Sequence, residues 1–144
     1  MKLIDIKREN WLEVIFLTTN SNNSHTLTDE FVASNAISIV QSVYEESWTI
    51  KAIENDGALI GFAMYGFCAE HGVYELCRIM IAYQYQGNGC GQKAMKLIIE
   101  EMIKQLYCDK IYLSTDSENV RGKHLYEKFG FAATGELWRD WSVI

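Results

Sequence analysis

The sequence predicts a mixed α/β (α+β) fold, with a mostly antiparallel sheet that carries helices on both of its faces. The first observation is a hairpin, because two apolar runs over 48–53 and 58–67 flank an Asp-Gly pair that is typical of a tight β-turn. The second is the segment 94–106, whose apolar residues recur at three- and four-residue steps as in an amphipathic helix. The third is the predicted element order, βααβββαβαβ.

The first twenty-five residues predict a strand, a short helix and a polar loop. Residues 2–7 alternate polar and apolar side chains, as expected for a strand. Asn10 is placed to cap a helix over 11–17, with Glu13 at the third helical position as in a capping box. The run 19–25 is polar and predicts a loop.

A second helix is predicted to begin near Thr28 or Asp29 and to end around Glu45 and Glu46. Acidic residues are unfavourable at the negative end of the helix dipole, so the terminal pair requires an explanation. Two explanations stay open. The glutamates form a solvated helix end, or Glu45 contributes a contact for a cationic substrate.

The rest of the chain is predicted to alternate strands and helices. The expected strands cover 48–53, 58–67, 73–81 and 109–114, and the expected helices cover about 91–106 and 119–129, the last closed by Gly130. The tail over 131–144 has room for one or two short strands. The sequence contains no linker or repeat, so we expect residues 1–144 to form one domain.

Composition excludes several classes of function. The net charge is −6, with 19 acidic and 13 basic residues and no basic cluster, which disfavours nucleic acid as a partner and is compatible with a cationic substrate. Four cysteines without C-x-x-C spacing and three histidines argue against a metal site. No apolar run reaches the roughly 18 residues that a membrane span needs, and residues 2–7 do not resemble a secretion signal. We therefore expect a cytoplasmic protein without a membrane partner.

A glycine-rich loop follows the strand 73–81 and opens directly onto a helix. Glycines allow backbone N–H groups to approach an anion closely, and the start of a helix favours negative charge. A Walker-type phosphate loop is excluded, because residues 91–94 read Gly-Gln-Lys-Ala instead of ending in Gly-Lys-Ser/Thr. A dinucleotide fingerprint fits residues 89–94, but that motif should follow the first strand of a longer βαβαβ unit.

Two motifs resemble those of a known superfamily. Residues 86–91 read Q-x-x-G-x-G, and residues 119–131 read N-x-x-G-x-x-x-Y-x-x-x-G-F. In this order they resemble the two signatures of the GNAT superfamily of acyl-CoA N-acetyltransferases, and the resemblance covers nearly the whole chain. It implies the GNAT fold and acetyl-CoA as co-substrate.

The resemblance also implies roles for individual residues. The loop that would hold the CoA pyrophosphate comprises Gln86, Gly87, Asn88, Gly89, Cys90, Gly91 and Gln92. Free backbone groups of Ile79, Met80 and Ile81 would pair with the pantetheine arm, and one N–H would polarise the thioester carbonyl. Asn119 would contact the cofactor from the far side. Tyr126 would protonate the departing thiolate, although a core tyrosine on an amphipathic helix is the structural alternative.

The acceptor amine must lose a proton, because an alkylammonium with a pKa of about 10 has no lone pair. Glu75 is the candidate base and substrate contact, since it is an acid within an apolar strand, where burial raises a carboxyl pKa. Two structural alternatives for Glu75 remain, a salt bridge with Arg78 and an exposed strand end. A chain of water is the alternative to Glu75 as the base. A covalent route through Cys77 or Cys90 has no histidine placed in sequence to activate the thiol, so direct transfer is expected.

Four stretches resemble a narrower group, the bacterial spermine/spermidine N-acetyltransferases. They cover 31–36, 61–66, 78–81 and 85–91, and the resemblance implies a polyamine or another primary amine as acceptor. Cys77, Cys90 and the tail over 137–141 depart from that group. An aminoglycoside, a peptide or protein N-terminus, or a non-catalytic acyl-CoA-binding module are the alternatives, and Trp138 and Trp141 could support a homodimer.

Overall fold

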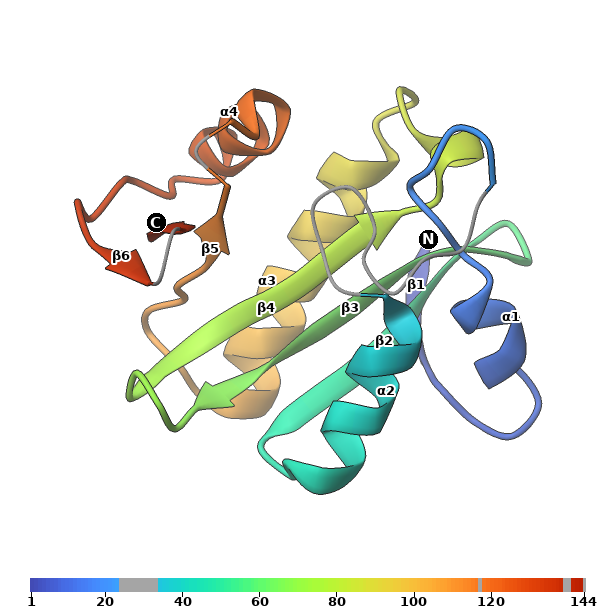
Figure 1. The fold of residues 1–144 in the computed structure, drawn as a ribbon, viewed down its shortest axis with the longest axis horizontal. Coiled ribbons are helices and arrows are strands. Elements are labelled where there is room, and N and C mark those ends of the chain that lie inside the picture. Colours follow the sequence, from blue (N-terminus) through green and yellow to red (C-terminus); the bar gives the residue numbers. More distant parts are fainter. Residues whose placement is uncertain (24–33, 117, 139–140, 144) are drawn as a thin grey trace.

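The computed structural model describes residues 1–23, 34–116, 118–138 and 141–143, with side chains as far as residue 136. Its centre is an antiparallel sheet with the strand order β1-β2-β3-β4 (Figure 1). The strands are β1 (Lys2–Asp5), β2 (Trp48–Asn55), β3 (Ala58–Cys68) and β4 (Val73–Ile81). The predicted hairpin between β2 and β3 is confirmed. Asp56 and Gly57 have φ values of 52° and 83°, as the favoured two-residue turn requires.

Helices cover both faces of this sheet, as predicted (Figure 1). On one face α3 (Cys90–Leu106) buries Met95, Ile98 and Met102 completely against the sheet. On the other face lie α1 (Trp11–Ile15) and α2 (Asn35–Tyr44), and the core there includes Val14 of α1 and Phe62 of β3. The sheet is therefore the middle layer of a three-layer arrangement.

The C-terminal part of the chain forms a second, smaller sheet beside β4. Its strand order is β5-β7-β6, and α4 (Val120–Lys128) follows β5 in the chain. The strands are β5 (Ser114–Thr115), β6 (Leu137–Trp138) and β7 (Trp141–Val143). The side chains of β6 and β7 lie outside the described part, so the predicted apolar contact through Trp138 and Trp141 stays a prediction.

The predicted strand over 109–114 is wrong in extent. Only residues 114 and 115 form β5, although Tyr112 makes a parallel bridge with Glu75 of β4. At this bridge the Leu76 N–H donates to the Tyr112 carbonyl at 2.9 Å, and the Tyr112 N–H donates to Tyr74 at the same distance. Beyond it the chain turns away from β4, so the two sheets meet at one point and then diverge.

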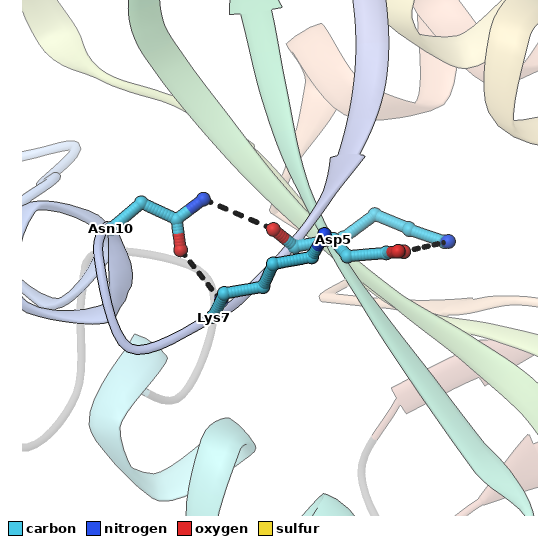
Figure 2. A network of polar contacts seen from close by, with 4 residues as sticks. Asp5, Lys7 and Asn10 are labelled. Atoms are coloured by element: carbon cyan, nitrogen blue, oxygen red, sulfur yellow. Dashed lines mark hydrogen bonds and ion pairs between the residues drawn. The ribbon is translucent and has the colours of Figure 1, made fainter.

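Asn10 occupies the N-cap position of α1, as predicted, but its side chain makes no capping hydrogen bond, so the predicted capping box is wrong. Its side-chain oxygen instead accepts from the Lys7 N–H at 2.7 Å, and its amino group donates to the Asp5 carbonyl at 3.0 Å (Figure 2). Because both polar groups of the amide close the turn after β1, neither is free for the helix. β1 accordingly ends at Asp5, and α1 ends at Ile15.

The described part of the second predicted helix is α2. The predicted start near Thr28 or Asp29 lies outside the described residues, and α2 begins at Asn35, after Ser34. The Ser34 hydroxyl accepts from the Ile37 N–H at 3.4 Å. Asn35 is buried and donates to the Val14 carbonyl at 2.8 Å, which fixes α2 against α1.

Candidate active site

A cleft of about 670 Å³ opens where β4 and the second sheet diverge. One wall is β4 from Leu76 to Ile81, and the other wall consists of β5 and α4. The loop between β4 and α3 closes one end through residues 86–92. The cleft therefore brings together the two motifs that the sequence singled out, which lie on opposite sides of it.

A β-bulge in β4 prepares its wall of the cleft. Met64 of β3 pairs with Arg78, whereas its neighbour Tyr65 pairs with Leu76, so Cys77 is an extra residue without a partner in β3. An inserted residue reverses the alternation of backbone groups along a strand. Before the bulge, Leu76 directs its N–H toward Tyr112 on the outer edge. Beyond the bulge, odd-numbered residues replace even-numbered ones in directing their backbone groups to that edge.

The outer edge beyond the bulge carries the backbone groups of Ile79 and Ile81. The Ala82 N–H donates to the Ile60 carbonyl of β3 at 2.8 Å, so Met80, two residues earlier, also directs its backbone toward β3. Ile79 and Ile81 then face the cleft. Of the three residues predicted to have free backbone groups, Met80 differs, because its backbone belongs to the β3 side although it contributes to the cleft lining.

The glycine loop has the geometry of an anion site. Gly89 precedes α3 in the left-handed conformation with φ 74°, and no side chain caps the helix. Gly87 also has a positive φ of 84°, and a Cβ built on either glycine would meet no atom within 4 Å. The first intrahelical bond is donated by Lys93 to Gly89, which leaves the preceding amides without helical partners. This open turn fits a phosphate-bearing ligand.

Gln86 connects the loop to both walls of the cleft. Its side-chain amino group donates to the Ile81 carbonyl at 2.9 Å. Its side-chain oxygen accepts from Arg121 of α4 at 3.4 Å. Gln86 therefore braces the end of β4 against α4 and places a guanidinium beside the loop. Gly87, Gly89, Gly91 and Gln92 also line the cleft, whereas Asn88 and Cys90 do not.

Tyr126 lies on α4 and lines the wall opposite β4. Its ring is half-buried and makes an edge contact with Phe131 at a centroid distance of 6.3 Å. Burial raises the pKa of the Tyr126 hydroxyl, and a hydrogen bond with the Thr115 side chain opposes that shift. The hydroxyl is therefore protonated at neutral pH and can donate a proton toward the cleft.

Asn119 supports this arrangement from the start of α4. Its side-chain oxygen accepts from the Gly122 N–H at 2.9 Å, which caps the helix, and its amino group donates to the Thr115 hydroxyl at 3.1 Å. A Cβ at Gly122 would collide with the Asn119 side chain, so any larger residue here would displace that side chain from its present position. Asn119 also lines the cleft, so its predicted contact with a ligand is geometrically open.

Glu75 does not line the cleft. Only 7% of its surface is exposed, and its carboxyl forms a hydrogen bond with the Cys68 thiol. Burial raises the pKa of Glu75, as the sequence predicted, while nearby His71 and Arg78 lower it. The alternative of a Glu75–Arg78 salt bridge is not found in the described part, where the Arg78 guanidinium donates to Gln41 at 2.9 Å instead.

Cys77, the bulge residue, lines the cleft with a half-buried thiol. Burial raises its pKa to about 11, and the charges of Glu75 and Glu45 act in the same direction. The thiol is therefore neutral at physiological pH and is not an activated nucleophile. This property favours direct transfer over a covalent route through Cys77.

Glu45 follows α2 and does not line the cleft. Its carboxylate accepts from the Trp48 indole N–H at 2.7 Å and from the Gln41 amide at 3.1 and 3.2 Å. The solvated helix end is thus partly correct, because the residue is exposed but its carboxylate is held in place.

The sequence did not single out Thr115, Arg121 and Gln41. Thr115 could have been found from its position at the end of a buried strand, four residues before the second motif. Arg121 lies within that motif at an unspecified position. Gln41 had no signal, because its contact with Arg78 joins residues 37 positions apart.

The described residues contain no group of three or more His, Cys, Asp or Glu side chains that could hold a metal ion. None of the described helices combines the length and apolar character needed to cross a bilayer.

Comparisons with known proteins point to one family. The family model described as the acetyltransferase (GNAT) family matches residues 24–131. Spermine/spermidine N(1)-acetyltransferase from Bacillus subtilis (strain 168) is 33% identical over 130 residues, which cover 81% of this chain and 86% of that relative.

Solved structures share the fold. A spermidine N-acetyltransferase from Vibrio cholerae in complex with CoA and spermine has a TM-score of 0.71 and 22% identity, covering 99% of this chain and 90% of that chain. An aminoglycoside acetyltransferase in complex with coenzyme A has a TM-score of 0.75 and 20% identity, covering 99% and 93%. The expected fold is confirmed.

Proposed function

Because this chain belongs to the GNAT acetyltransferase family, we propose that it transfers an acetyl group from acetyl-CoA directly to a primary amine of a polyamine such as spermine or spermidine. One observation carries the proposal. A strand edge with free backbone groups faces a protonated tyrosine across a cleft, and an open glycine loop closes one end of that cleft. The polyamine acceptor is supported by the relative that shares 33% of its residues.

The donor would occupy the cleft lengthwise. The loop from Gln86 to Gln92 would hold the pyrophosphate through its amides, with Arg121 adding positive charge. The outward backbone groups of Ile79 and the N–H of Ile81 would pair with the pantetheine arm, since the Ile81 carbonyl already accepts from Gln86, and Asn119 would contact the arm from the α4 side. Acetyl-CoA supplies an activated acyl thioester when bound.

Two features of β4 and α4 serve the chemistry. An N–H on the β4 edge polarises the thioester carbonyl, because a fixed donor in a desolvated cleft stabilises negative charge that develops on oxygen. Tyr126 holds a proton on its hydroxyl, since burial keeps its pKa above the ordinary value. We propose that it gives this proton to the departing thiolate.

The acceptor ammonium must lose a proton before attack. Glu75 is buried beside Cys68 and outside the cleft lining, so we propose that water accepts this proton and that Glu75 acts at most through a chain of water. Glu45 is proposed to contact a second cationic group of the acceptor. Its exposed carboxylate lies on the α2 side of the sheet, and its charge helps to raise the pKa of the cleft residue Cys77.

The test is acetyl-CoA-dependent thiol release across spermine, spermidine, putrescine, an aminoglycoside and a short peptide. The four cysteines of the chain require a blank without acceptor. We expect selective turnover of the polyamines. Selective turnover of the aminoglycoside or of the peptide would show that the acceptor belongs to that class of amine instead of the polyamines. Tight acetyl-CoA binding without turnover of any amine would favour a non-catalytic acyl-CoA-binding module.

A further inference from the structure

Four side chains, from β4, α2, the residue after α2 and β2, form a continuous hydrogen-bonded chain beside the cleft. The Arg78 guanidinium of β4 donates to the Gln41 side-chain oxygen of α2 at 2.9 Å. The Gln41 amino group donates to both Glu45 carboxylate oxygens at 3.2 and 3.1 Å. The Trp48 indole N–H of β2 donates to one of those oxygens at 2.7 Å. We call these four residues the Glu45 relay.

The relay leaves Glu45 little orientational freedom. Arg78 cannot accept a hydrogen bond, so the Gln41 amide must direct its oxygen to Arg78 and its amino group to Glu45. Trp48 is only 9% exposed and belongs to the core between the sheet and the α1–α2 layer. The carboxylate is therefore fixed from two sides although the residue itself is exposed.

The relay begins at the cleft. Arg78 and the bulge residue Cys77 both line it, and the Glu45 charge contributes to the raised pKa of the Cys77 thiol. A carboxylate already oriented by two donors loses less conformational entropy on binding a cation than a free side chain loses. Glu46, the next residue, is also exposed and makes no hydrogen bond or ion pair in the described part of the chain, so the two glutamates differ mainly in this support.

We infer that Gln41, Arg78 and Trp48 are positioning residues, which hold the Glu45 carboxylate so that it binds the distal ammonium of a polyamine whose reacting amine lies in the cleft. This inference rests on the proposed function and adds how a diamine is distinguished from a monoamine. A monoamine has no second charge to offer Glu45. The relay should therefore contribute to the KM of a polyamine and leave the KM of a monoamine unchanged.

The experiment is a double-mutant cycle on Glu45 and Gln41, measured with spermidine and with butylamine. Glu45→Gln should raise the KM for spermidine about tenfold. Gln41→Met keeps the length of the side chain and removes its hydrogen bonds with Glu45 and Arg78, and it should raise that KM about threefold to fivefold. Because Gln41 acts through Glu45, the double variant should match Glu45→Gln alone. The kcat for either amine and the KM for butylamine should not change, and Glu46→Gln should behave as wild type.

A purely structural role of Gln41 predicts a different result. If Gln41 only joins α2 to β4, Gln41→Met would raise the KM for both amines, and its effect would add to that of Glu45→Gln. That pattern, or an unchanged spermidine KM in Glu45→Gln, would overturn the inference. Arg78→Lys retains a donor and should restore part of the spermidine preference that Arg78→Met loses.

A binding signal separates the relay from the enzymatic proposal. The chain has four tryptophans, so four indole N–H signals are expected by NMR, and Trp48→Phe identifies one of them. Spermidine should shift this signal and butylamine should not. A shift without turnover would keep the relay and reject polyamine acetylation. Turnover without a shift and without a Glu45→Gln effect would keep the proposed function and reject the relay.

Discussion

The two halves of β4 use the same backbone for different purposes. From Val73 to Leu76 the strand is bonded on both sides, to β3 and to Tyr112. From Arg78 to Ile81 it is paired only with β3 in the described part, and its outer edge faces a cleft. One extra residue, Cys77, separates the halves. The difference shows that a single bulge frees the outer edge of the strand for the binding that we propose, and we call residues 73–76 the structural half and residues 78–81 the binding half of β4.

The bulge also changes the side-chain pattern. Cys77 packs with the core on the α1–α2 side, and Arg78 contacts Met64 and Gln41 on that same side. In a regular strand two consecutive residues face opposite sides. The binding half therefore directs both its free backbone edge to the cleft and a guanidinium to α2.

The largest effect is expected in the glycine loop that follows the binding half of β4. Gly89→Asp should abolish acetyl-CoA binding, because it introduces a negative charge where the loop amides favour an anion. Gly89→Asn is the matched control, since asparagine has nearly the same size and also tolerates φ 74°. Calorimetric titration should show loss of affinity in the first variant and only partial loss in the second. Equal affinities in both folded variants would contradict the loop assignment.

Proline within β4 compares the two kinds of backbone group directly. Ile79→Pro removes an N–H that faces the cleft, so the protein should fold and lose about a hundredfold in kcat/KM. Met80→Pro removes an N–H that faces β3 and should prevent folding. Circular dichroism and thiol release measure the two outcomes. If Ile79→Pro unfolded as readily as Met80→Pro, the assigned backbone directions would be wrong.

Tyr126→Phe examines the wall opposite β4. We expect kcat to fall about tenfold to a hundredfold, as for loss of a general acid, with acetyl-CoA affinity nearly unchanged. Thr115→Val removes the hydroxyl that contacts Tyr126 and should have a smaller effect in the same direction. Steady-state kinetics measure kcat, and a direct titration measures the acetyl-CoA affinity. An unchanged kcat would reject Tyr126 as the proton donor.

Glu75→Gln examines the structural half and should have the smallest kinetic effect. Burial raises the folded-state pKa of Glu75 above 4.5, so the wild-type protein loses stability relative to the variant as pH rises from about 4.5 through that pKa. Above it, the stability difference should be constant and favour the glutamine variant. Urea unfolding between pH 4 and 8 measures the trend.

The same variant tests the base. With water as the proton acceptor, kcat should stay within about twofold of wild type, whereas loss of a general base costs about a hundredfold or more. A large decrease in kcat with an unchanged spermidine KM would restore Glu75 as the base.

Local patterns in the sequence predicted much of this site. The Asp56-Gly57 turn and the amphipathic period of α3 are set by neighbouring residues, and the resemblance placed Gln86, Asn119 and Tyr126 on one cleft. Their signals are short-range or lie within a continuous motif, so sequence alone carries them.

The features that sequence missed depend on tertiary pairing. The bulge at Cys77 becomes apparent only when β4 is registered against β3, and this register removes Met80 from the outward edge. Asn10 was expected to cap a helix, but two backbone partners nearer β1 compete for its amide. Glu75 was correctly expected to have a raised pKa, yet it lies outside the cleft lining, and its carboxyl forms a hydrogen bond with the Cys68 thiol.

Asn119 caps the start of α4 and also donates to Thr115, which contacts the Tyr126 hydroxyl. In evolutionary terms, selection for a stable α4 and selection for the position of Tyr126, the proposed proton donor, act on the same side chain. Serine or aspartate at this position could satisfy the helix, but neither can donate an amide hydrogen to Thr115. Substitutions that are neutral for folding would therefore still be removed, and the start of α4 should vary less among descendants of this chain than its exposed neighbour Val120.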